Sequence, residues 1–191
     1  MHALTLIKKD HEAVEALFKK FEKLGARGEK TKRRLVDQMI AALSTHAAIE
    51  EQLLYPALRE KAPQSEDDVL EALEEHHVMK WTLLELERLG PEDERFDAKV
   101  TVLMENVRHH VKKEETELFK ICRKALKPPE LEALGNALAK AKKMAPKRPH
   151  PSSPDSPPGN IISGAIAHVL DQAKEKVQSA FGRSHNSAAA E

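Results

Sequence analysis

Apolar residues recur every three or four positions along four stretches of the first 127 residues, which is the period of an amphipathic α-helix. Glycine or proline residues close these stretches in turn, at Gly25–Gly28, Pro63, Gly90–Pro91 and Pro128–Pro129. Four such helices with short connections fold most simply as an antiparallel up-down-up-down bundle. The pattern therefore predicts an all-α four-helix bundle over residues 1–127.

The pattern changes after the bundle. Residues 128–144 predict one short additional helix. Six of the 11 prolines then lie between Pro146 and Pro158, so we interpret 145–160 as a Pro-rich extended linker. An amphipathic run follows within 161–191, and it predicts a C-terminal amphipathic helix with a frayed tail. This helix is expected to dock back onto the bundle or to be partly disordered, with a protein partner or a membrane surface as the alternatives; its mixed polar face gives a membrane little support.

One histidine lies on the apolar face of each predicted helix: His11, His46, His76 and His110. In antiparallel neighbours, two residues lie at the same height when their numbers average to the middle of the connecting turn. The averages for these histidines fall in or beside the predicted turns, within roughly one helical turn at about 1.5 Å of rise per residue. The sequence thus predicts four imidazoles in one layer of the core.

Two glutamates join this layer. Glu50 follows His46, and Glu114 follows His110, by four positions, which places each glutamate on the same helical face as its histidine. A buried ionised glutamate without a partner is costly and rare. Imidazole nitrogens and carboxylate oxygens together suit iron, manganese or zinc. Because HAAIEEQLLY (46–55) and HHVKKEETELF (109–119) repeat one motif, the chain resembles two copies of a helix pair, and we expect a dinuclear site with open positions.

Tyr55 is a weaker candidate ligand. A phenolate binds ferric iron well, and Pro56 loosens the helix at this point, so the direction of the ring cannot be predicted from a regular helix. Phe119 occupies the equivalent position of the second copy, which favours a simple need for an aromatic ring.

Other polar residues flank the layer. We expect His77 and His109 to be exposed or to support a neighbour by a hydrogen bond, and Glu51 and Glu115 to lie on the solvated face. Asp10 and Glu75 each precede a candidate ligand, and either an orienting role or an ordinary surface position fits them equally well.

Composition narrows the function classes. The chain has 31 basic and 31 acidic residues, so it lacks the basic footprint of a nucleic-acid-binding protein. Its single cysteine, Cys122, excludes an internal disulfide and a thiolate metal cluster. The N-terminus does not resemble a signal peptide, and no apolar run approaches the ~20 residues of a transmembrane segment, so a cytoplasmic protein is expected.

These motifs resemble those of the hemerythrin-like HHE cation-binding family. The matching pieces are KKDHEAVEALF, HAAIEEQLLYPAL, LEEHHVMKW and VRHHVKKEETELF, over roughly residues 4–127, and the stretch ending in PPGN is similar to tails on some bacterial members. The resemblance implies a non-haem di-iron centre, two iron ions with a bridging oxygen species, in preference to manganese or zinc. The ligands that it implies are His11, His46, Glu50, His76, His110 and Glu114.

The sequence also departs from oxygen-carrying hemerythrins. Lys80 stands where those proteins have a second histidine on the third helix, and Glu114 comes four residues after its histidine where they place a carboxylate at five. More carboxylate and less imidazole favours the ferric state. We therefore expect a protein that handles or senses iron, O₂, NO or peroxide. The alternatives are a catalase- or peroxidase-like enzyme and a metal-stabilised scaffold that acts through its C-terminal helix.

Overall fold

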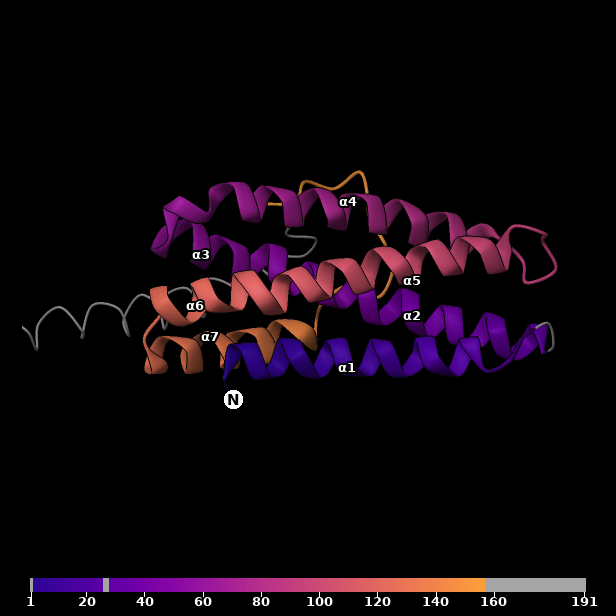
Figure 1. Cartoon of the computed structure of the whole chain (residues 1–191), viewed down its shortest axis with the longest axis horizontal. Coiled ribbons are helices and arrows are strands. Elements are labelled where there is room, and N and C mark those ends of the chain that lie inside the picture. The colour runs from indigo at the N-terminus through magenta and orange to yellow at the C-terminus, as the bar shows by residue number, and fades with distance from the viewer. Residues whose placement is uncertain (1, 26–27, 157–191) are drawn as a thin grey trace, which may run out of the picture.

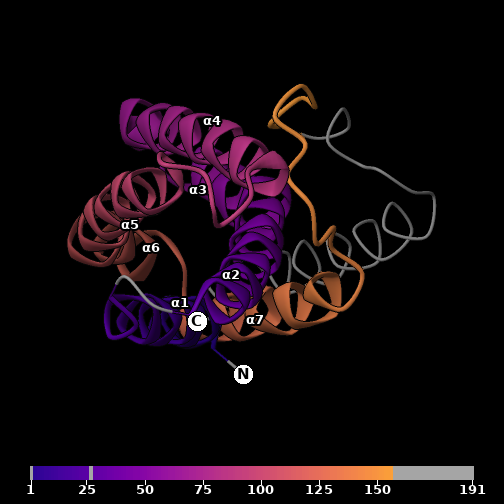
Figure 2. The same cartoon turned by 90° about the vertical axis from the view of Figure 1, so that its right-hand side faces the viewer.

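A computed structural model describes residues 2–25 and 28–156, and these residues form helices, turns and irregular chain without any strand. Figures 1 and 2 show long helices lying side by side around a common core. The helices are α1 (Ala3–Glu22), α2 (Glu29–Ile49), α3 (Tyr55–Lys61), α4 (Glu66–Arg88), α5 (Phe96–Lys113), α6 (Phe119–Ala125) and α7 (Pro128–Lys142). A short 3₁₀ turn at Pro63–Ser65 precedes α4.

A π-helical turn connects two consecutive helices at two places in the chain. The turn η1 (Glu50–Leu54) joins α2 to α3, and η3 (Glu114–Leu118) joins α5 to α6, so each pair continues as one long helix. Together with α1 and α4 they make the four antiparallel helices of the bundle, as the apolar pattern predicts. The all-α bundle is thus confirmed.

The connection between α1 and α2 requires glycine. Gly25 and Gly28 have φ values of 55° and 85°, in the left-handed region that side chains with a Cβ rarely adopt. Gly28 is also the residue that immediately precedes α2. The two glycines therefore let the chain reverse within a few residues.

The chain beyond the four helices packs on the outside of the bundle. Helix α7 lies against α1 and α2, and the chain that follows it crosses α2 and α4 (Figure 2). Pro149 and Pro151 are buried in this crossing. The predicted C-terminal helix lies outside the described residues. Among the helices described, none is both long and apolar enough to cross a membrane.

A polar layer divides the apolar core into two clusters. One cluster, which includes Ile7, Leu73 and Leu118, gathers at the end of the bundle where α7 packs. The other, which includes Val14, Met79 and Val107, fills the opposite half. Each of the four core histidines lies between residues of the two clusters along its helix, His46 between Leu43 and Ile49, so the fold places them at one level, as the sequence predicts.

Candidate metal centre

The four core histidines form two pairs of imidazole rings. The ring centroids of His11 and His46 are 4.9 Å apart, and those of His76 and His110 are 4.7 Å apart. The two pairs adjoin through His46 and His76, whose centroids are 6.3 Å apart. All four side chains are buried. Each pair comes from consecutive long helices, so the internal repeat of the sequence becomes a repeat in space.

The first group of candidate ligands consists of His11, His46, Glu50 and Glu114. The Nε2 atom of His11 lies 3.1 Å from Glu114 Oε2, and the Nε2 atom of His46 lies 3.2 Å from Glu50 Oε2. One donor atom from each residue lies within 4.8 Å of every other. Glu114 therefore joins the histidine of α1, although its spacing in the sequence pairs it with His110.

The second group consists of Glu50, His76 and His110. The Nε2 atoms of the two histidines are 3.2 Å apart, and Glu50 Oε2 lies 3.4 Å from that of His76. Two nitrogens that bind one ion at about 2.1 Å would be separated by a similar distance. The hydroxyl of Tyr55 lies 3.4 Å from both Glu50 Oε2 and His76 Nε2, so the ring points into this group.

The π-helical turns explain how Tyr55 reaches the centre. In η1 the N–H of Tyr55 donates to the carbonyl of Glu50, five residues back, so the widened turn brings both side chains to one face. In η3 the N–H of Phe119 donates to the carbonyl of Glu114 in the same way, and the Phe119 ring lies 6.3 Å from that of His11. The sequence signals only a loosened helix at Pro56, and the second turn forms without a proline.

Carboxylates outside the centre hold three of the four imidazoles. The Nδ1 atoms of His11, His76 and His110 lie 2.9, 3.1 and 2.7 Å from carboxylate oxygens of Glu115, Glu51 and Glu75, respectively. Each of these hydrogen bonds fixes the ring so that Nε2 faces inward. Each carboxylate supports a histidine of a different helix, and Glu75 supports His110 in place of the adjacent His76.

The predicted solvated position is wrong for Glu51 and only partly correct for Glu115. Glu51 is buried with 4% of its surface exposed, and the side chain of Glu115 is 29% exposed. In a bundle, positions beside the apolar stripe face a neighbouring helix, so these side chains reach a histidine across the interface. Lys80 also binds Glu51 and compensates its charge in this buried place.

The remaining flanking residues lie farther out. Asp10 corresponds to Glu75 in the repeat, so it would be expected to bind His46 as Glu75 binds His110. It pairs instead with Lys142 of α7. His77 is exposed and accepts a hydrogen bond from the Trp81 indole at 3.1 Å. His109 is exposed and lies 3.6 Å from Glu75. The expectation that these two histidines are exposed is therefore confirmed.

The inward-facing atoms fit a metal ion. Among the described residues, several buried polar atoms of the layer lack a hydrogen-bond partner: both ring nitrogens of His46, Nε2 of His11, Oε1 of Glu50 and both carboxylate oxygens of Glu114. Leaving such groups unsatisfied in a core costs about 1–3 kcal/mol each. A cation bound among them would satisfy the inward-facing atoms, Nε2 of His46 included, whereas Nδ1 of His46 points away and would still lack a partner among the described residues. The nitrogen and oxygen chemistry of the inward atoms suits a borderline or hard ion.

Electrostatics set the two glutamates apart. Burial and the nearby charge of Glu114 raise the pKa of Glu50 well above its usual value. Burial also acts to raise the pKa of Glu114, but the close contact with His11 and its charge overcome it and lower that pKa. Burial and the neighbouring imidazoles lower the pKa of His46 well below its usual value. The layer therefore holds protons that a cation would have to displace.

Comparisons with known proteins relate this chain to a cation-binding domain. The model of the hemerythrin HHE cation-binding domain matches residues 2–122. An uncharacterized hemerythrin-like protein of Schizosaccharomyces pombe is 24% identical over 171 residues, which is 89% of this chain and 83% of that protein. A DNA nickase of Nostoc is 28% identical over 148 residues, covering 78% of this chain and 41% of the nickase.

A solved structure shares the fold. The crystal structure of a hemerythrin HHE cation-binding domain-containing protein from Mycobacterium kansasii superposes with a TM-score of 0.66 at 22% identity, over 75% of this chain and 86% of that one. Because the family model spans most of the chain and ends within α6, just beyond the polar layer, the chain belongs to the hemerythrin HHE cation-binding domain family.

Proposed function

We propose that this protein binds two iron ions at the polar layer and uses them to handle or sense iron, O₂, NO or peroxide. The observation that carries the proposal is that Glu50 belongs to both groups of candidate ligands. A carboxylate shared between two groups is the arrangement by which facing helices build dinuclear sites. His11, His46 and Glu114 would hold one ion, and His76 and His110 the other.

The donor set favours iron over manganese or zinc. Imidazole nitrogens suit iron and zinc, whereas carboxylate oxygens suit harder ions, and a mixture of both with open positions is typical of non-haem iron. Bound iron would supply a change of oxidation state and a position for a small molecule. The chain itself orients the ligands, because Glu115, Glu51 and Glu75 fix three imidazoles and the two apolar clusters limit the access of water.

Tyr55 is an additional ligand in this proposal, and its position supports that role. Its hydroxyl is fully buried and lies 3.4 Å from atoms of Glu50 and His76. Burial and the charge of Glu50 raise the pKa of Tyr55 well above its usual value, so the phenol keeps its proton without a cation nearby. Ligation would therefore require an ion of high charge, such as ferric iron, which a phenolate suits.

The decisive test is metal content. Mass spectrometry of the full-length, untagged protein from iron-replete cells should give about two irons per chain, and the same sample should show near-ultraviolet absorption of an oxygen-bridged pair. The variant His46→Ala should lose iron, whereas His77→Ala, which removes an exposed histidine outside the layer, should retain it. One zinc per chain, or no metal, would overturn the proposal.

Peroxide dismutation is the alternative function. It is supported by the side chains around the second group of candidate ligands, which can transfer protons. The Tyr55 hydroxyl and the carboxylates of Glu51 and Glu75 lie within hydrogen-bond reach of the histidines of that group, so the phenol can supply a proton and the carboxylates can accept one. Addition of H₂O₂ to the iron-loaded protein would release O₂ faster than the same amount of free iron does. Equal rates would eliminate the enzyme and leave the binding function.

A further inference from the structure

Lys80 holds the carboxylate that supports His76. It lies one helical turn after His76 on α4 and is buried, with 7% of its surface exposed. Its Nζ atom donates to both oxygens of Glu51, at 2.9 and 3.1 Å, and Glu51 Oε1 lies 3.1 Å from His76 Nδ1. The three side chains therefore form a continuous path from α4 to α2 and back to an imidazole of the candidate metal centre.

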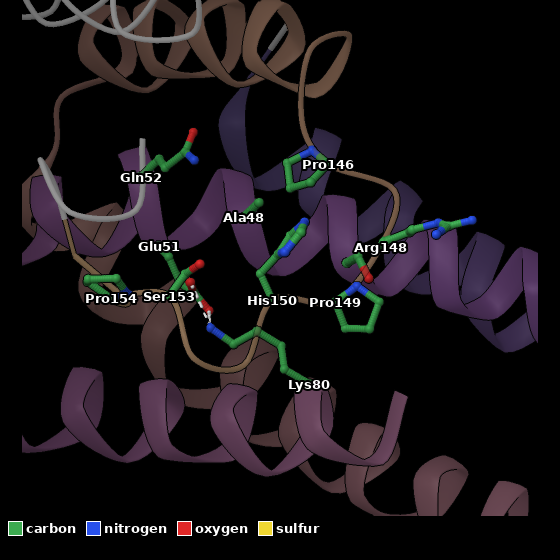
Figure 3. Close-up of a pocket in the computed structure, with 11 residues that line it drawn as sticks. Ala48, Glu51, Gln52, Lys80, Pro146, Arg148, Pro149, His150, Ser153 and Pro154 are labelled. Carbon is green, nitrogen blue, oxygen red and sulfur yellow. Dashed lines mark hydrogen bonds and ion pairs between the residues drawn. The ribbon is translucent and has the colours of Figure 1, made fainter. Parts of the chain in front are cut away.

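The chain that follows α7 covers this path. The segment Pro146–Pro154 crosses between α2 and α4 and lines, together with Lys80 and Glu51, a partly open cavity of about 30 Å³ (Figure 3). Such a cavity has room for about one or two waters. Two contacts fix the segment: the Thr45 hydroxyl donates to the carbonyl of Pro146 at 3.1 Å, and Arg148 lies 3.3 Å from Glu87.

The equivalent carboxylate in the other half lacks both features. Glu115 supports His11, but its side chain is 29% exposed. The residue one turn after His11 is Glu15, which binds Arg108 at 3.0 Å. Among the residues that the structure describes, no lysine is paired with Glu115. The lysine and the covering segment are thus particular to the carboxylate that supports His76.

The apolar surroundings strengthen the interactions along this path. A buried carboxylate without a cation is costly, and exclusion of water strengthens the attraction between Lys80 and Glu51. Both oxygens of Glu51 accept from Lys80, and Oε1 also lies against Nδ1 of His76, so this carboxylate is held between the two donors.

We propose that Lys80 is a positioning residue for His76, and that the Pro146–Pro154 segment maintains this role by shielding the Lys80–Glu51 pair from bulk water. Lys80 fixes Glu51, and Glu51 holds the proton of His76 on Nδ1, so that Nε2 faces Glu50 and His110. The consequence for metal retention rests on the proposed function, whereas the consequence for the imidazole does not.

The variant Lys80→Met tests the positioning in the metal-free, full-length protein. ¹⁵N NMR of the histidine rings should show a slowly exchanging His76 Nδ1–H in the unaltered protein and exchange about tenfold faster in the variant. Lys80→Arg should restore slow exchange. The matched control is Lys32→Met, because Lys32 is also a buried lysine with a carboxylate partner, Asp97, but lies far from the layer on the Gly28 side. Equal exchange in Lys80→Met and the unaltered protein would overturn the proposal.

Metal retention tests the consequence. With Co²⁺ as the probe, a chelator should remove one of two ions about tenfold faster from Lys80→Met than from Lys32→Met, while the other ion leaves at the same rate in both. Replacement of 146–154 by a Gly/Ser stretch of equal length should act in the same direction with a smaller effect. Equal loss of both ions would show a general loosening and contradict the proposal. Failure to bind any Co²⁺ would refute the metal site, and the NMR comparison would still decide whether Lys80 positions His76.

Discussion

The two halves of the bundle repeat one plan and differ in its details. The first half, from α1 through η1, and the second half, from α4 through η3, each contribute two histidines, one inward glutamate and a π-helical turn. In both, the carboxylate that follows the inward glutamate supports a histidine of the opposite half. In the repeated motif, each half thus supplies a carboxylate that orients a histidine of the other half.

The differences make the two ligand groups unequal. Tyr55 carries a hydroxyl beside the second group, and its counterpart beside the first group is Phe119. His110 is supported by Glu75, whereas Nδ1 of His46 is buried with no hydrogen-bond partner among the described residues. A repeat of helix positions therefore fixes where the candidate ligands lie, and individual substitutions would decide how firmly each group holds an ion.

The largest effect is expected from Glu50, because it belongs to both groups. Glu50→Ala should reduce the metal content from about two ions per chain to nearly none, whereas Glu114→Ala should remove about one. Mass spectrometry of protein prepared side by side measures both. The exposed Glu12 provides the matched control, and Glu12→Ala should retain both ions. Loss of only about one ion in the Glu50 variant would show that this carboxylate is not shared.

Tyr55→Phe should make the second half resemble the first. We expect the iron-loaded variant to lose visible charge-transfer absorption and to release one ion about tenfold faster to a chelator. The free energy of unfolding of the metal-free protein should change by no more than about 1 kcal/mol, because the hydroxyl makes only long hydrogen bonds. An unchanged spectrum would show that the phenol does not bind iron.

The sequence predicts the histidine layer because helical periodicity and turn position fix the height and the face of each residue. It does not predict which carboxylate meets which histidine. Glu114 joins His11, and Glu51 reaches His76, because of the handedness with which the helices follow one another around the bundle. An amphipathic pattern is compatible with either hand. Glu51 is buried for the same reason, since the pattern treats every position beside the stripe alike.

The hydrophobic pattern of the sequence also does not predict the π-helical turns or the contact that α7 makes with Asp10. Pro56 indicates a weakened helix in the first half, but the second half has Lys120 at that position and forms the same turn. Asp10 resembles Glu75 in the repeat, yet Lys142 takes its carboxylate. That contact depends on where a separate helix docks, and a short amphipathic helix does not specify its own docking site.

Asp10→Glu should bring the first half closer to the second. The longer side chain gives the carboxylate a reach equal to that of Glu75, so we expect it to bind Nδ1 of His46 and to slow the release of one ion severalfold. Chelator competition measures the release, and ¹⁵N NMR of the His46 ring should report the new hydrogen bond. Lys142→Met serves as the control, because it removes the competing cation without lengthening the acid. If Asp10→Glu accelerates release, then the pair with Lys142 itself supports the centre.

The smallest effect is expected at Cys122, which follows Phe119 by three positions just as Leu58 follows Tyr55. Both side chains are fully buried in the cluster beside α7. Burial, together with the charge of Glu114, raises the pKa of Cys122 to about 12, so the thiolate form that binds metal is scarce near neutral pH. Cys122→Ala should lower the free energy of unfolding by about 1 kcal/mol in urea and leave the metal content unchanged. Loss of metal in this variant would mean that the thiol takes part in the centre, and the two halves would then differ in their ligands as well as in their support.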